Sequence, residues 1–330
     1  MNEGLVSTII PVFNRGEMLR EAVASVLGQT YRPIEVDIVD DGSTDDTPDV
    51  CRALVNEHPE SVRVRRQENS GPGVARETGR GMAHGEFIQY LDSDDLLDRR
   101  KFEVQVATLR ANPDCGVAYC YTRYYRIGET PTDRPWKGSG RTVETMFPSF
   151  LNERWWDTPT PIYRRSVCDA AGPWSNLRLE EDWEYDCRIA ALGTRLVHCR
   201  EFLVDVRDHA EARLCRGAEN DPARMRERGR AHGLVYQHAR RAGIGPDDLH
   251  MQRYARELFL LARQCGAAGL AHESRELFEL AREASGPQRA QGRDFLIYDR
   301  VARCLGWRMA GRLACYLDAW RPQRDGIRVK

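Results

Sequence analysis

The first ~125 residues alternate short apolar runs with stretches in which apolar residues recur at helical spacing. Apolar runs predict β-strands at residues 5–11, 34–39, 62–64, 86–91 and 117–121. Helical spacing predicts helices around residues 19–27, from a Thr47 N-cap onward, at 72–83 and at 101–110. The strand at 62–64 alternates with arginine, as expected of an outer strand. Strands separated by helices of this length predict an α/β fold with a mostly parallel sheet covered on both faces.

The remainder of the chain departs from this pattern. Residues 126–175 are rich in Pro, Gly, Trp and Thr without a steady period, which indicates a functional loop or elements too irregular to recognise. From about residue 216 the composition shifts to Arg, Ala and Leu at helical spacing, with a hint of a helical hairpin at residues 256–284. Three repeats are not found, so a solenoid is not supported. We therefore expect an α/β domain at residues 1–215 and a helical region at residues 216–330.

Composition and charge exclude several classes of protein. The 330 residues include 49 Lys+Arg and 50 Asp+Glu, a net charge of −1, whereas a nucleic-acid-coating protein shows a basic excess. No apolar run approaches the ~18 residues of a membrane span. The N-terminus lacks the order of a signal peptide, so a cytoplasmic location is expected. The ten cysteines include no C-x-x-C pair, which disfavours structural zinc and favours buried thiols.

Polar motifs follow several of the predicted strands, at the position where open α/β sheets bind ligands. Pro11-Val12-Phe13-Asn14 closes the first strand, and Asp40-Asp41-Gly42-Ser43 closes the second. Each is also explained by a strand end, a helix cap or a glycine turn. Gly71-Pro72-Gly73 nearly matches a dinucleotide fingerprint, but Arg76 occupies its third glycine position. An arginine just inside a helix N-terminus is better suited to hold an anion or a base edge.

The run Leu91-Asp92-Ser93-Asp94-Asp95 is the candidate metal site. An apolar strand delivers its three carboxylates to one edge of the sheet, where their charges repel unless a cation neutralises them. Hard oxygen ligands of this kind suit Mg²⁺ or Mn²⁺ bridging a diphosphate. A solvated acidic loop is the simpler alternative, and the metal site is favoured over it.

A second acidic cluster opens the helix predicted between Leu179 and Gly193. Adjacent helical residues point about 100° apart, so Glu181 and Asp182 cannot both face the same reacting atom. One of the two must therefore be structural. Carboxylates at a helix N-terminus also complement the helix dipole, which is the alternative explanation for the whole cluster.

Four motifs occur in order between about residues 4 and 210: STIIPVFNRGEMLREAVASVLGQTY, EVDIVDDGSTDDT, QENSGPGVARETGRGMAHGEFIQYLDSDD and AAGPWSNLRLEEDWEYDCRIAALG. Together they resemble the family 2 glycosyltransferases, and the resemblance implies the GT-A fold. It also implies an inverting, metal-dependent transferase that takes its sugar from a nucleoside-diphosphate donor, usually of uridine. One departure is Glu77, where the family often has Asn, and we interpret it as a change in a supporting residue.

The resemblance also assigns roles to individual residues. Pro11 and Phe13 would line the base pocket, and Asp41 would bond the base or ribose. Arg76 would lie beside the base, Asp92 would hold the ribose, and Ser93 would bind the donor. Asp94 would bind Mn²⁺ or Mg²⁺, Asp182 would be the catalytic base, and His209 would assist at the metal or diphosphate. The match at His209 is loose, and a histidine in a surface loop is the alternative there.

Two other functions stay open at this point. A sugar nucleotidyltransferase would need a Gly-rich loop with Lys or Arg directly after the first strand, and residues 11–16 are not Gly-rich. The second open function is that of a non-catalytic scaffold that binds a nucleotide sugar. The intact Asp92, Asp94 and Asp182 weigh against this function. The acceptor is undefined: a glycan or polysaccharide, a lipid-linked intermediate, a protein or a small molecule.

An amphipathic helix is predicted near the C-terminus. Its apolar stripe is Met309, Leu313, Tyr316, Leu317 and Trp320, with Arg308, Arg312, Arg321 and Arg324 nearby. Such a helix suits the inner surface of a membrane, close to a lipid-linked acceptor. Docking against its own protein is the more common role of an amphipathic helix and is the alternative.

Overall fold

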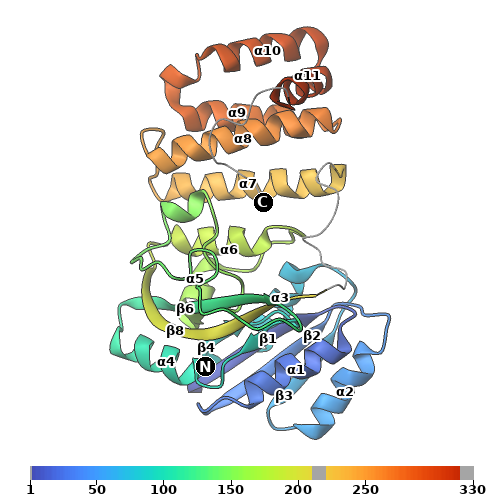
Figure 1. Cartoon of the computed structure of the whole chain (residues 1–330), viewed down its shortest axis with the longest axis vertical. Helices are drawn as coiled ribbons and strands as arrows, with labels where there is room; N and C mark the ends of the chain where they lie inside the picture. Colours follow the sequence, from blue (N-terminus) through green and yellow to red (C-terminus); the bar gives the residue numbers. More distant parts are fainter. Residues whose placement is uncertain (1, 210–220, 320–330) are drawn as a thin grey trace. The chain divides into compact units, whose positions relative to one another are not determined.

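Figure 1 shows the computed structural model, which describes residues 2–209 and 221–319. The chain separates into two compact units, Met1–Arg213 and Leu214–Lys330, and each is described by itself. The boundary predicted between residues 215 and 216 lies outside the described residues, as do Trp320, Arg321 and Arg324 of the predicted C-terminal stripe.

The first unit is built on a single sheet. Its strands are β1 (Asn2–Val12), β2 (Ile34–Asp40), β3 (Val62–Arg66), β4 (Gly85–Tyr90), β5 (Leu96–Leu97), β6 (Cys115–Arg126), β7 (Ile162–Arg164) and β8 (Arg195–Asp208). They lie in the order β3-β2-β1-β4-β7-β6-β8-β5. The pairs β3–β2, β2–β1, β1–β4 and β6–β8 are parallel, and β4–β7, β7–β6 and β8–β5 are antiparallel. The expected α/β fold with a mostly parallel sheet is confirmed.

Helices cover both faces of this sheet. They are α1 (Gly16–Leu27), α2 (Thr47–Glu57), α3 (Pro72–Met82), α4 (Lys101–Ala111), α5 (Arg165–Ala171) and α6 (Glu181–Ala190). On β1, Val6 and Ile10 share a core cluster with Val23 of α1, whereas Ile9 faces Gly79 of α3. Successive side chains of a strand point to opposite faces, so a strand covered on both faces is apolar at nearly every position.

Sequence patterns predict neither β7 nor β8. β7 lies in the segment without a steady period and has only three residues, too few to show one. β8 is longer, but its pairing with β6 shifts register around Tyr121, which interrupts a simple alternation. The same irregular segment contains α5 and a 3₁₀ turn at Ser149–Leu151.

The prediction that Thr47 caps α2 is wrong by one residue. Asp46 is the N-cap residue, and Thr47 is already helical and buried. The Thr47 hydroxyl instead accepts a hydrogen bond from the backbone N–H of Arg15, at 2.9 Å. It therefore ties α2 to the loop that follows β1.

The second unit is helical in the residues described, as expected. Its helices are α7 (Pro222–Arg241), α8 (Leu249–Ala267), α9 (Ala271–Arg289), α10 (Arg293–Leu305) and α11 (Trp307–Ala319). The hairpin indicated by the sequence corresponds to α8 and α9, which pack together, with the ring centres of Phe259 and Phe278 5.7 Å apart. Among the described helices, none is long and apolar enough to cross a membrane.

Replacement of Gly79 should test the close packing of α3 on the sheet. A Cβ at Gly79 would lie 2.4 Å from Cγ2 of Ile9, so we expect Gly79→Ala to lower the free energy of unfolding by about 1–3 kcal/mol. A Cβ at Gly81 of the same helix would have nothing within 4 Å, so Gly81→Ala should be neutral or stabilise by about 0.5–1 kcal/mol. Urea unfolding of both variants makes the measurement, and equal loss of stability in the two would contradict it.

Candidate active site

The segments that follow β1, β2 and β4 lie at the carboxyl edge of the parallel part of the sheet. Pro11 is half-buried at the end of β1, and Phe13 just beyond it is 44% exposed. Asn14 adopts a left-handed conformation with φ of 52° and accepts a hydrogen bond from the Thr44 backbone N–H at 2.8 Å. The loops after β1 and β2 are thus joined beside an exposed aromatic ring.

Asp41 is buried at the end of β2 and is engaged by the loop that leads into α3. Its Oδ1 accepts hydrogen bonds from Gln67 Nε2 at 2.8 Å and from the Ser70 N–H at 2.9 Å. Its Oδ2 accepts from the Gly71 N–H at 2.9 Å. In this structure Asp41 therefore shapes the entry to α3, and its predicted contact with a base or ribose stays a prediction.

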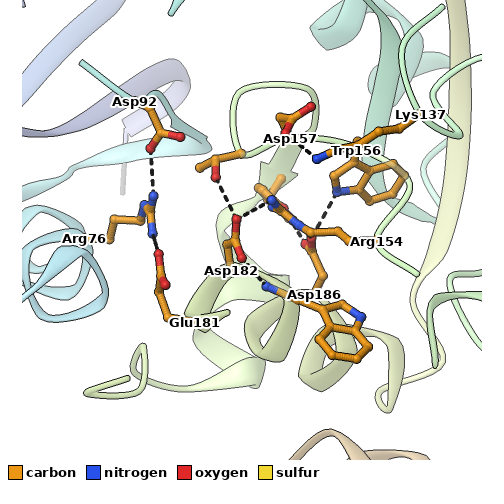
Figure 2. Close-up of polar contacts among 12 residues, drawn as sticks. Arg76, Asp92, Lys137, Arg154, Trp156, Asp157, Glu181, Asp182 and Asp186 are labelled. Atoms are coloured by element: carbon orange, nitrogen blue, oxygen red, sulfur yellow. Dashed lines mark hydrogen bonds and ion pairs between the residues drawn. The ribbon is translucent and has the colours of Figure 1, made fainter. Parts of the chain in front are cut away.

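Arg76 joins two carboxylates from distant parts of the chain, as Figure 2 shows. Its Nη2 donates to Asp92 Oδ1 and its Nη1 to Glu181 Oε1, each at 2.7 Å. Its guanidinium lies 4.9 Å from the centre of the Trp174 ring, and only 3% of the residue is exposed. Burial opposes its charge, but the two carboxylates outweigh burial and raise the pKa of Arg76. The structure thus places Arg76 between carboxylates, and its predicted place beside a base is untested.

The turn after β4 meets the end of β8. Asp94 Oδ2 lies 2.8 Å from His209 Nε2 and accepts a hydrogen bond from Arg15 Nη1 at 2.8 Å. Asp94, His209 and Ser93, which precedes Asp94 in the turn, are all buried. Although His209 is a loose match in the sequence, the fold brings it to the aspartate predicted to bind a metal.

Asp95 shows the electrostatic cost of the acidic turn. Its Oδ1 accepts a hydrogen bond from the Arg207 N–H at 3.0 Å. Burial, followed by the negative charges of Asp94 and Asp92, raises the pKa of Asp95 well above its ordinary value. The negative charges of the turn therefore oppose ionisation of Asp95.

Asp94 and His209 fit a divalent cation that completes its coordination with ligands from the substrate. Among residues 2–209 and 221–319, no group of three or more His, Cys, Asp or Glu side chains is placed to hold a metal. Mg²⁺ is usually held by one or two carboxylates together with water and substrate phosphates, not by an all-protein cage. Carboxylate oxygens also suit Mn²⁺. The adjacent carboxylate and imidazole provide such a partial set of ligands.

Glu181 and Asp182 point in different directions from the start of α6, as the helical geometry predicts. Glu181 is buried against Arg76, whereas Asp182 Oδ2 accepts a hydrogen bond from Arg154 Nη1 (Figure 2). The same oxygen accepts a second hydrogen bond from Thr158 Oγ1 at 3.5 Å. The Asp182 side chain is 29% exposed and that of Glu181 is 9% exposed. Asp182 is therefore the more accessible of the two to a substrate.

The two carboxylates also differ in their pKa values. Burial, followed by the charge of Asp182, raises the pKa of Glu181 to about 7. Burial alone would raise the pKa of Asp182, but the positive charges of Arg154 and Arg76 outweigh it and lower that pKa. At neutral pH Asp182 is thus ionised and able to accept a proton.

Asp186, another acidic residue of α6, holds the surroundings of Asp182 in place. Asp186 Oδ2 accepts from Arg154 Nε at 2.7 Å and from Trp156 Nε1 at 3.1 Å. Its Oδ1 accepts from the Tyr163 hydroxyl at 2.9 Å. Asp186 and Arg154 are absent from the sequence-based predictions. The available signals were the adjacent Trp155-Trp156 pair beside Arg154, and the i,i+4 spacing that puts Asp186 on the same side of α6 as Asp182.

Comparisons with known proteins agree with these motifs. Residues 7–168 match the family described as Glycosyl transferase family 2. The chain contains a family 2 glycosyltransferase domain. An uncharacterized glycosyltransferase of Rickettsia conorii is 36% identical to the chain over 129 residues, which cover 39% of this chain and 20% of that protein. The chain spans only 20% to 33% of the length of three curated relatives that it matches.

Solved structures share the fold of this family 2 glycosyltransferase domain. TarS 1-349 of S. aureus, in complex with UDP-GlcNAc, superposes with a TM-score of 0.66 at 18% identity, over 96% of this chain and 93% of TarS. The mannosyltransferase PcManGT from Pyrobaculum calidifontis, in complex with GDP-Man and Mn²⁺, has a TM-score of 0.54 at 19% identity over 96% of this chain and 87% of PcManGT. The sheet and its helices are therefore of the GT-A type, as the motifs imply.

The raised pKa of Glu181 predicts a dependence of stability on pH. Between its ordinary value of 4.5 and about 7, the folded chain holds this proton more firmly than the unfolded chain. The free energy of unfolding should therefore decrease as pH rises through this range. Glu181→Gln removes the titrating group, so its urea midpoint should change less between about pH 5 and pH 7.5 than that of the unmodified chain.

Glu144→Gln is the matched control for this measurement, because the Glu144 side chain is 85% exposed. Its urea midpoints should follow those of the unmodified chain across the range. An unchanged slope in Glu181→Gln would contradict the assignment of the raised pKa.

Proposed function

We propose that the chain is an inverting, metal-dependent glycosyltransferase that moves a sugar from a nucleoside-diphosphate donor to an acceptor hydroxyl. The observation that carries the proposal is the meeting of separate motifs at one edge of the sheet. Arg76 connects Asp92 with Glu181 at the start of α6, and Asp94 contacts His209. Asp182 lies beside this connected set with an ionised carboxylate.

The donor is assigned to the loops at the ends of β1, β2 and β4. Phe13 offers an exposed ring to a nucleotide base beside Pro11, and the partly exposed Asp92 offers carboxylate oxygens to ribose hydroxyls. Asp94 and His209 would hold Mn²⁺ or Mg²⁺, which when bound would neutralise the negative charge that grows on the leaving diphosphate. Arg15, which donates to Asp94, adds a fixed positive charge at the same place.

Asp182 is assigned as the general base. The acceptor oxygen forms a bond to C1 of the sugar while the bond from C1 to the diphosphate oxygen breaks, and the configuration at C1 is inverted. A carboxylate with a low pKa cannot fully deprotonate an alcohol beforehand, so Asp182 takes the hydroxyl proton as the new bond forms. General base catalysis contributes about 10²–10⁴-fold, which leaves the rest to orientation and to charge stabilisation.

A uridine nucleotide is the proposed donor, and the complexes of TarS with UDP and with UDP-GlcNAc support this choice. The proposed role is in glycan or polysaccharide biosynthesis, with a glycan, a lipid-linked intermediate or a small molecule as the acceptor. A cytoplasmic location is proposed with it, since every cysteine in the described residues is a free thiol. The net charge of −1 is the reason that no nucleic-acid partner is proposed.

Asp94→Ala should abolish the metal-dependent part of donor binding. The variant retains His209 but loses the carboxylate that would share the cation, so UDP should bind equally weakly with and without Mn²⁺. Titration calorimetry with UDP provides the measurement, and Asp114→Ala is the control because the Asp114 side chain is 59% exposed and pairs with Arg195. Unchanged Mn²⁺-dependent affinity in Asp94→Ala would contradict the metal assignment.

Asp182→Asn should separate chemistry from binding. It keeps the shape of the side chain but removes the proton acceptor, so turnover should fall about 10²–10⁴-fold with nearly unchanged donor affinity. Glu181→Gln should reduce turnover less and stability more, because Glu181 faces Arg76 and not the acceptor. The assay is hydrolysis of a UDP-sugar at saturating donor and Mn²⁺.

Two outcomes of this comparison would change the assignment. If Glu181→Gln is inactive while Asp182→Asn turns over, Glu181 is the base. If both variants retain full activity, the base lies elsewhere and the pair only caps α6.

A further inference from the structure

Exposed apolar side chains concentrate on the last two described helices. Eleven large hydrophobic side chains are exposed among the described residues, and seven of them belong to α10 and α11. These seven are Leu296, Ile297, Leu305, Met309, Leu313, Tyr316 and Leu317. Scattered exposed hydrophobic residues need no explanation, whereas their concentration on two helices that pack against each other indicates an interaction surface.

The packing of α11 determines which of its sides faces outward. Its inner side includes Ala310 and Gly311, and a Cβ at Gly311 would lie only 2.4 Å from the backbone nitrogen of Ala267 in α8. That close backbone contact fixes the rotation of α11 about its axis. Met309, Leu313 and Tyr316 therefore lie on the opposite side, at the i, i+4, i+7 spacing of a single helical stripe.

The outward side of α10 has the same character. Its inner side is formed by Phe295, Tyr298 and Ala302, which are buried. Leu296 and Ile297, 53% and 62% exposed, lie on the other side. We call the exposed set of seven hydrophobic residues the α10–α11 face.

Basic residues accompany this face, and their charge is not offset within the two helices. α10 and α11 contain five arginines and three aspartates: Arg293, Arg300, Arg303, Arg308 and Arg312, with Asp294, Asp299 and Asp318. Every one of these aspartates pairs with an arginine in the structure, Asp294 with Arg289, Asp299 with Arg303 and Asp318 with Arg263. Together with the exposed Arg300, Arg308 and Arg312, this gives the two helices a net positive charge.

We propose that the α10–α11 face docks on an anionic lipid surface. The inference does not depend on the proposed transferase activity, since none of these residues belongs to the site of the first unit. Helices that lie in a membrane interface combine an exposed apolar stripe with arginines or lysines beside it, and this is the combination found here. No helix needs to cross the bilayer for such binding, in agreement with the lengths and hydropathy of the described helices.

The charges favour a lipid surface over a second copy of the chain. A symmetric dimer through this face would place two surfaces of the same positive charge against each other, and like charges repel. An anionic membrane instead attracts each arginine near its surface, while the leucine and tyrosine side chains enter the boundary between headgroups and acyl chains.

The test is co-sedimentation of the purified full chain with vesicles. Vesicles of phosphatidylcholine alone are compared with vesicles of phosphatidylcholine mixed with phosphatidylglycerol in equal parts. We expect binding to the anionic vesicles, little binding to the neutral ones, and release at about 1 M salt, where the Debye length is ~3 Å.

Paired variants separate the two contributions to binding. Arg308→Gln with Arg312→Gln should weaken binding to anionic vesicles by about fivefold per arginine. Leu313→Gln with Leu317→Gln should weaken it by about tenfold or more, because both side chains are exposed and lose only their contact with lipid. Leu249→Gln, at a leucine that is 71% exposed in α8, and Arg253→Gln, at an exposed arginine of the same helix, are the matched controls and should bind as the unmodified chain does.

Three results would overturn the proposal: no sedimentation with the anionic vesicles, equal binding to neutral and anionic vesicles, or a stable dimer that Leu313→Gln with Leu317→Gln dissociates. Circular dichroism of each variant shows that loss of binding is not loss of folding. Hydrolysis of a UDP-sugar should be the same in the Leu313/Leu317 variant as in the unmodified chain. Failure of vesicle binding and failure of the transferase proposal are therefore observed independently.

Discussion

The buried guanidinium of Arg76 is the contact on which the rest of the candidate site depends. It comes from α3 and holds Asp92, at the end of β4, and Glu181, at the start of α6. Burial of a single charge is expensive, and breaking a buried ion pair by removing one partner typically costs about 3–5 kcal/mol. The three elements are thus coupled, because the Arg76 guanidinium of α3 pairs with one carboxylate from each of the other two.

That coupling accounts for the division of roles at the start of α6. Glu181 is committed to Arg76 and is buried, whereas the ionised Asp182 is the more exposed of the two carboxylates. Asp182 points towards Arg154, which Asp186 holds one turn further along the helix. A single helix therefore contributes a structural acid, a proposed base and the support for the arginine that keeps that base ionised.

The helical unit presents a different kind of surface. Its core is apolar and well covered, yet α10 and α11 leave leucine, isoleucine, methionine and tyrosine side chains exposed beside arginines. In the polar site of the first unit, arginines pair with carboxylates, whereas the two helices of the α10–α11 face carry more arginines than aspartates. The partners proposed for the two surfaces differ accordingly: a nucleotide sugar for the first and an anionic lipid surface for the second.

The sequence by itself determined the alternation of strands and helices, the acidic motifs at strand ends and the opposed directions of Glu181 and Asp182. These follow from local periodicity: two residues per strand repeat and 3.6 per helical turn. Only the tertiary structure decided that β7 lies between β4 and β6, that His209 meets Asp94 from 115 residues away, and that Arg154 reaches Asp182. Contacts between residues so far apart leave no periodic trace in the chain, because they depend on how whole elements pack and not on the residues beside each partner.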